Sequence, residues 1–277
     1  MKFIGSRNSI NSAKTVLIGI PFDATSSFRS GSRFAPNSIR LYSDSLETYS
    51  PVFDSDIEDL PFYDYGDIFV TINNFKKLSE NIEEMYPQLI KQNKKILSIG
   101  GEHLITYPIL LSYKKMFPDL KIIHIDAHAD LRDNYLGEKF SHATVIRRIS
   151  EFINPDNIFQ FGIRSGTREE FEFAEKNTNF FPFNLSENIN ILKKIQGEKV
   201  YVTLDLDVLD PSIFPGTGTP EPGGVFYKEL EIFLKHLYNL DIIGGDVVEL
   251  LPDNDRNGIS SIVAAKIIRE LIIIMNK

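Results

Sequence analysis

Two apolar segments of this chain each run into closely spaced acidic residues, and this repeated arrangement constrains the fold more than any other feature. Residues 121–125 are apolar and largely β-branched, which predicts a buried strand of a parallel sheet. Asp126, His128 and Asp130 follow at alternate positions, so their side chains share one side if the chain stays extended. Because a buried carboxylate without a partner is strongly unfavourable, this spacing predicts a bound cation.

The second segment, residues 200–204, is an apolar run that leads into Asp205 and Asp207. A third predicted strand, residues 95–99, leads through two glycines to His103. The carboxyl ends of strands in an open parallel sheet gather at one edge, so these strand ends would bring four Asp and two His together. Six ligands exceed the need of one ion and suit two divalent ions that share a carboxylate.

The types of ligand indicate which ions are bound. Oxygen ligands with a minority of imidazole, in a chain without cysteine, favour Mn²⁺ over Zn²⁺ or a purely oxygen-ligated Mg²⁺ site. Four ionised carboxylates would also balance the charge of two divalent ions. The sequence therefore predicts two Mn²⁺ ions per chain.

A less specific interpretation treats these residues as solvated loop acids and ordinary core histidines. It suits any single Asp-x-Asp pair, but five ligands in two alternating runs and a sixth after a glycine turn argue against it. His124 shares the alternation and could be a seventh ligand, although its apolar neighbours favour a core or supporting role. His236 lies in a predicted helix far from the motifs and is expected to be structural.

Length and composition fit one α/β domain over residues 1–277, with 42% hydrophobic and 25% charged residues. The net charge of −8 argues against a nucleic-acid partner and mildly favours cationic ligands. The absence of cysteine excludes disulfides and thiol catalysis. The N-terminus lacks an apolar signal core and the apolar runs are strand-sized, so we expect a cytoplasmic protein without a membrane span.

Predicted strands and helices alternate along the rest of the chain. This order predicts a three-layer α/β/α fold with a mostly parallel central sheet and right-handed crossovers. Further strands are expected at residues 15–20, 157–163, 180–183 and 241–248, and a short one within the loop 51–66. Helices are expected to start at Pro36 and to span residues 74–93, 104–117, 141–150, 167–176, 188–196, 227–237 and 259–275.

At these motifs the sequence resembles the ureohydrolase family, whose members include arginase and agmatinase. The shared signatures are GGEH at residues 100–103, DAHAD at 126–130, and DLD at 205–207 followed by DPS. The resemblance extends in the family's order from GIPFD at 19–23 to Glu249. It implies an arginase-like fold and a binuclear manganese centre. The ligands that it implies are His103, Asp126, His128, Asp130, Asp205 and Asp207.

The resemblance also implies catalytic and substrate-binding residues. Asp130 is expected to accept a hydrogen bond from a metal-bridging hydroxide. His142 matches a family histidine at the mouth of the site, where it would contact substrate, and a pKa near 6.5 suits a proton shuttle. Glu249 matches the family's substrate-binding glutamate and could hold a guanidinium through two parallel hydrogen bonds. The alternatives are an exposed helix-start histidine and a surface salt-bridge glutamate; Asp246 has no assigned role.

The favoured reaction is hydrolysis of agmatine to putrescine and urea. The loop at residues 215–224 and the N-terminal pattern are closer to agmatinases than to arginases. Asp133 and Glu138, in the loop that follows Asp130, are acidic and therefore compatible with the distal ammonium group of agmatine. Another guanidino substrate, such as arginine or guanidinobutyrate, and a non-catalytic, metal-stabilised homologue remain alternatives. The family further implies a homo-oligomer, either a trimer or a hexamer.

Overall fold

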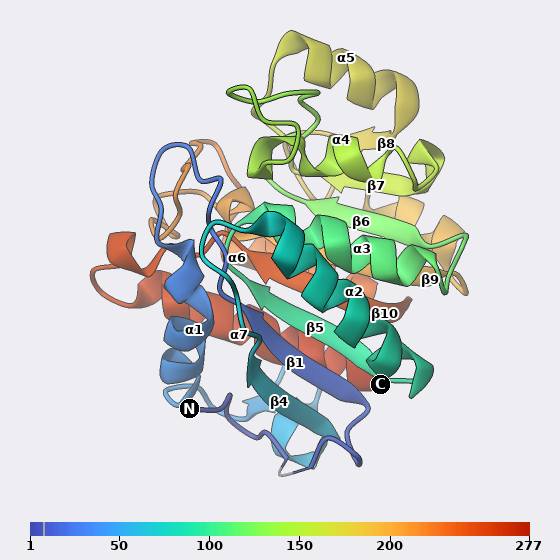
Figure 1. Ribbon diagram of the computed structural model, residues 1–277. Helices are drawn as coiled ribbons and strands as arrows, with labels where there is room; N and C mark the ends of the chain where they lie inside the picture. The colour runs from blue at the N-terminus through green and yellow to red at the C-terminus, as the bar shows by residue number, and fades with distance from the viewer. Residues whose placement is uncertain (8) are drawn as a thin grey trace.

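The structure is a computed structural model that describes residues 1–7 and 9–277, and its centre is an eight-stranded sheet (Figure 1). All neighbouring strands in this sheet pair in parallel. In spatial order the strands are β4 (Phe62–Asp67), β1 (Thr15–Ile20), β5 (Lys95–Gly100), β10 (Asp241–Val248), β9 (Lys199–Asp205), β6 (Lys121–Ile125), β7 (Ile158–Phe161) and β8 (Asn179–Phe181). A separate antiparallel pair joins β2 (Tyr49–Ser50) to β3 (Ser55–Asp56).

Helices cover both faces of the sheet, which confirms the predicted three-layer class (Figure 1). Each face has its own hydrophobic cluster. One contains residues of α1 (Ala35–Ser43), α6 (Tyr227–Leu237) and α7 (Ile259–Asn276). The other contains residues of α2 (Phe75–Lys91), α3 (Thr106–Lys114), α4 (Val145–Ile149) and α5 (Arg168–Asn177).

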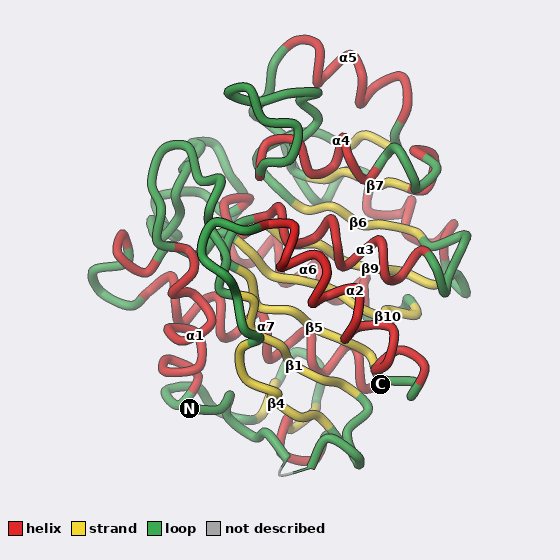
Figure 2. The backbone as a smooth tube through the Cα atoms, viewed as in Figure 1, coloured by secondary structure: helices red, strands yellow, loops and turns green. Residues whose placement is uncertain are grey.

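The strands read as continuous apolar runs because helices pack on both of their faces. Every residue of β1 is buried, as are all residues of β9 except the first. In α2, Leu78, Ile82 and Leu89 follow helical spacing and face the core. The central position of β5, β10, β9 and β6 in the sheet places their carboxyl ends side by side. Figure 2 shows long loops gathered at one end of the sheet.

Three local predictions differ from the structure. The predicted helix at residues 188–196 is wrong: η6 (Ile189–Ile195) is a 3₁₀ helix, and its buried Ile189, Leu192 and Ile195 recur every three residues, the period of that helix. The predicted helices at 104–117 and 141–150 each begin with a 3₁₀ turn, η3 (His103–Ile105) and η4 (His142–Thr144). Residues 51–66, expected to be a loop with a short strand, contain β3 and most of the edge strand β4. Among the described residues, no helix has both the length and the apolar character needed to cross a membrane.

Candidate metal centre

The four central strands carry the predicted site residues to one end of the sheet. His103 follows β5, Asp126 to Asp130 follow β6, and Asp205 and Asp207 lie at the end of β9. The turn after β5 needs a glycine, since a Cβ at Gly101 would lie 1.9 Å from the carbonyl oxygen of Phe22. The structure thus brings all six predicted ligands together.

Backbone strain accompanies the ends of two of these strands. Asp130 has a φ of 54°, and Glu249, which follows β10, has a φ of 67°. Residues other than glycine rarely adopt such left-handed conformations, and they persist where surrounding contacts hold them. Both side chains are buried. This backbone conformation is therefore part of how the fold directs their carboxylates.

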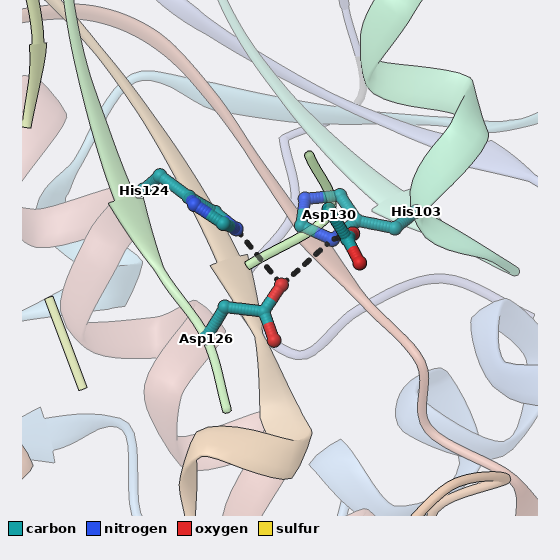
Figure 3. A group of neighbouring side chains, drawn as sticks. All are labelled: His103, His124, Asp126 and Asp130. Carbon is teal, nitrogen blue, oxygen red and sulfur yellow. Dashed lines mark hydrogen bonds and ion pairs between the residues drawn. The ribbon is translucent and has the colours of Figure 1, made fainter. Parts of the chain in front are cut away.

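The first cluster surrounds one ring nitrogen of His103. Its Nδ1 lies 3.1 Å from Asp126 Oδ2, 3.1 Å from Asp130 Oδ2 and 3.3 Å from Asp205 Oδ2. Figure 3 shows Asp126 between His103 and His124, with Asp130 beside His103. Neighbouring ligands of an octahedral ion lie about 3 Å apart when each is about 2.1 Å from the metal. The spacing of these atoms fits a shared cation.

Hydrogen bonds on the far side of the ring decide the tautomer of His103. The Thr203 hydroxyl lies 2.8 Å from His103 Nε2 and donates its only proton to Asp246 Oδ1 at 2.7 Å. It therefore accepts a hydrogen bond from Nε2–H, so in the neutral imidazole Nδ1 carries the lone pair and faces three carboxylates. Burial alone would lower the pKa of His103, but the proximity of these carboxylates raises it well above its ordinary value. Nδ1 is buried and has no hydrogen-bond partner in the described structure. A cation satisfies both the lone pair and the carboxylates.

The second cluster consists of Asp126, His128 and Asp207. His128 Nδ1 lies 2.9 Å from Asp207 Oδ2 and 3.7 Å from Asp126 Oδ1. Asp126 belongs to both clusters, with Oδ2 toward His103 and Oδ1 toward His128. A carboxylate shared in this way suits a binuclear metal site.

The electrostatics of the site also favour bound cations. Burial and the charges of Asp207 and Asp126 raise the pKa of Asp205 well above its ordinary value, and burial also raises that of Asp207. Burial alone would lower the pKa of His128, but the charge and hydrogen bond of Asp207 raise it to about 11. The metal-free chain thus retains protons among crowded carboxylates. Metal ions could take the place of those protons.

His124 supports the cluster through Asp126. Its Nε2 donates to Asp126 Oδ2 at 2.8 Å, while its Nδ1 accepts from Gln160 Nε2 at 3.1 Å. The orientation of Gln160 is set by Ala129, whose carbonyl oxygen accepts a second hydrogen bond from the same amide nitrogen at 3.1 Å. Both ring nitrogens of His124 are thus engaged, although His124 also lies within one of the groups that could hold a metal ion. His236 lies apart in α6, where its Nδ1 contacts the Ile232 carbonyl oxygen.

Glu249 and His142 line a small pocket next to the predicted ligands, since Glu249 contacts His103. Glu249 Oε1 accepts a hydrogen bond from the His103 backbone N–H at 2.8 Å, and burial together with the charge of Glu102 raises its pKa well above its ordinary value. Burial lowers the pKa of His142. In the loop that follows Asp130, the exposed Asp133 is paired with Arg148.

The sequence pattern of the Arginase family matches residues 13–274. The chain belongs to the arginase family. Agmatinase from Bacillus cereus is 44% identical over 275 residues, which cover 98% of this chain and 95% of the relative. Guanidinobutyrase from Pseudomonas aeruginosa is 32% identical, with coverages of 98% and 89%. The crystal structure of agmatine ureohydrolase from Thermoplasma volcanium superimposes with a TM-score of 0.89 at 33% identity, covering 99% of this chain and 94% of that one.

This arginase-family site includes buried polar residues that the sequence motifs did not reveal. Thr203 and Asp246 orient His103, and Gln160 orients His124. Glu102 lies inside the GGEH signature, but its partner Thr25 is 77 residues away in the sequence. The one available signal was the presence of polar residues within apolar strands, as at Thr203 and Gln160.

Proposed function

We propose that this arginase-family hydrolase cleaves the guanidinium group of agmatine to give putrescine and urea, with two Mn²⁺ ions per chain. The main supporting observation is the position of Asp126 between two groups of metal-binding side chains, next to a pocket that contains Glu249. The relatives that match over nearly the whole chain include agmatinases. The donor set of oxygen with some imidazole suits Mn²⁺.

The six predicted ligands fit this role because they combine a lone pair on His103 with carboxylates at ligand-to-ligand spacing. When bound, the ions would supply a nucleophile by lowering the pKa of a coordinated water. The residues proposed to hold them are His103, Asp126, His128, Asp130, Asp205 and Asp207. Asp130 is also proposed to orient the attacking water through a hydrogen bond.

Glu249 is proposed to bind the substrate's guanidinium. Its Oε1 already accepts the His103 N–H, which fixes the carboxylate and leaves Oε2 for substrate. Burial opposes ionisation of this carboxylate, and a cationic guanidinium in the pocket would favour it. His142 lines the same pocket and, being neutral at pH 7 because burial lowers its pKa, could accept a proton and deliver it to the leaving amine.

Two alternatives differ in substrate or activity. The guanidinobutyrase relative, at 32% identity, supports another guanidino compound as substrate. A non-catalytic, metal-stabilised homologue is disfavoured because Glu249 and His142 lie together beside the ligands.

The test is urea release by the Mn²⁺-loaded chain from agmatine, arginine and guanidinobutyrate at equal concentrations. We expect the highest kcat/KM with agmatine, and no urea from the Asp126→Asn control. A higher kcat/KM with another compound would reassign the substrate. No urea from any compound, with two ions bound, would support the non-catalytic alternative.

The domain organisation and assembly are also proposals. We propose that residues 1–277 form a single ureohydrolase domain, which the family match over residues 13–274 supports. A trimeric or hexameric homo-oligomer stays a prediction from the family resemblance, and a cytoplasmic location stays a prediction from the amino-acid sequence.

A further inference from the structure

The imidazole of His142 lies between two hydroxyl groups of the loop that follows β1. Thr25 Oγ1 lies 3.4 Å from Nδ1 and also accepts the His142 backbone N–H at 3.0 Å. Ser27 Oγ lies 3.3 Å from Nε2, on the more exposed side of the ring. The directions of these hydrogen bonds decide which ring nitrogen carries the proton.

Glu102 sets the direction on the Nδ1 side. Its side chain is fully buried and accepts two hydrogen bonds from Thr25, from the hydroxyl at 2.7 Å and from the backbone N–H at 2.8 Å. A hydroxyl has one proton, and the Thr25 proton is directed at the carboxylate. Toward His142, Thr25 can therefore act only as an acceptor, and Nδ1 must be the protonated nitrogen.

Tyr135 sets a compatible direction on the Nε2 side. Its hydroxyl donates to Ser27 Oγ at 3.2 Å, which leaves the Ser27 proton free to point at Nε2. The Tyr135 ring also packs edge-on against His142, with ring centroids 5.6 Å apart. Both sides of the imidazole thus favour the same tautomer.

We propose that Glu102 and Thr25 are positioning residues that hold His142 as the Nδ1–H tautomer, with Nε2 as its basic nitrogen. This inference rests on the proposed function, in which His142 transfers a proton to the leaving amine. The arrangement resembles other sites where an acidic group orients a histidine, but here a threonine hydroxyl lies between the two. Neither residue needs to touch the substrate.

The first test is the tautomer itself, read from ¹⁵N shifts of the full-length, metal-free chain labelled at histidine. The chain has only five histidines, and the His142 signal is identified by its loss in His142→Ala. At pH 8.5 we expect a protonated Nδ1 and an unprotonated Nε2. Thr25→Val should weaken this preference, since only the Ser27 side of the ring would still favour it, and the matched control Thr25→Ser should keep it.

Glu102→Gln provides a second, isosteric variant in case Thr25→Val does not fold. Its amide oxygen can accept the Thr25 backbone N–H, so its amide NH₂ would face the Thr25 hydroxyl and donate to it. The hydroxyl proton would then be free to point at His142 Nδ1, and the tautomer should reverse to Nε2–H. An Nε2–H tautomer in the unmodified chain, or no change in either variant, would overturn the proposal.

Kinetics separate this proposal from the proposed function. We expect Thr25→Val to lower kcat for agmatine about 10–100-fold, the range seen for supporting residues of metal sites, with KM nearly unchanged and two ions retained. Thr25→Ser should restore kcat. If the tautomer changes as expected but kcat does not, the proton-transfer role of His142 is wrong while the positioning stands. If no substrate yields urea, the NMR result still decides the positioning.

Discussion

Replacement of Thr203 by Val would test whether the hydroxyl behind His103 prepares the metal centre. Thr203 is fully buried and Val has nearly the same shape, so the change removes hydrogen bonds with little change in packing. The lost contacts are those to His103 Nε2 at 2.8 Å and to Asp246 Oδ1 at 2.7 Å, and a longer one to Thr106 Oγ1 at 3.4 Å. Asp246 keeps its Oδ2 contacts with Tyr201 and Thr106. The main consequence is therefore an unpaired Nε2–H on His103.

Two magnitudes follow for Thr203→Val. A buried polar group left without a partner costs about 1–3 kcal/mol, so the free energy of unfolding of the metal-free chain should fall by that amount. Without the Thr203 hydroxyl as an acceptor, the ring proton of His103 can also move from Nε2 to Nδ1, where it competes with the metal. Loss of such supporting contacts weakens metal binding about 10–100-fold, equivalent to about 1.4–2.7 kcal/mol.

The assay is a competitive titration of Mn²⁺ against a chelating dye at pH 7.5, with thermal unfolding of the metal-free chain measured in parallel. Thr203→Ser keeps the hydroxyl and is the matched control, so its metal affinity should stay close to that of the unmodified chain. The reasoning is refuted if Thr203→Val binds Mn²⁺ as tightly as the unmodified chain. It is also refuted if Thr203→Ser weakens binding equally.

Four further predictions follow from the site. Asp126→Asn should lose both ions and urea release together, because Asp126 lies in both clusters; elemental analysis showing two ions would contradict its shared role. His142→Ala should lower turnover but retain two ions, and loss of metal would mean that its role is misassigned. Metal binding should release protons and weaken as pH falls, because the pKa of His128 is raised to about 11 and its proton must leave before the metal binds. Calorimetry in two buffers of different ionisation enthalpy measures the proton release, and equal metal affinity at pH 6 and pH 8.5 would contradict the prediction. Gly101→Ala should lower the free energy of unfolding by about 1–3 kcal/mol, since its Cβ would meet the Phe22 carbonyl oxygen; an unchanged melting temperature would argue against that close approach.

Strands and most helices of this protein are predictable because each depends on local patterns. The buried strands β5, β6 and β9 are short apolar runs, and their polar residues at the carboxyl ends are visible in the sequence. Local patterns were less informative where the helix type depends on spacing, as in η6, whose apolar residues recur at intervals of three. The edge strand β4 was also difficult, since it is partly exposed and lacks a continuous apolar run.

The order of strands in the sheet is not a local property. β10 is the last strand in the sequence, yet it lies between β5 and β9. Pairing at this position depends on how the whole chain packs, and it brings Glu249 next to His103 across 146 residues. Sequence spacing alone placed Glu249 at a strand end but not within hydrogen-bonding distance of a predicted metal ligand.

The sequence by itself determined the candidate ligands, because acidic and histidine side chains directly after buried apolar runs are visible without the rest of the chain. The alternation predicted for Asp126, His128 and Asp130 does not hold them in place, since β6 ends at Ile125 and the backbone of Asp130 is left-handed, with a φ of 54°. Only the tertiary structure decided the protonation and orientation of the histidines. The partners that set them, Thr203 for His103 and Thr25 for His142, are 100 and 117 residues away in the sequence. Hydrogen bonds act over about 3 Å, so these pairs exist only once folding has brought distant strands and loops together.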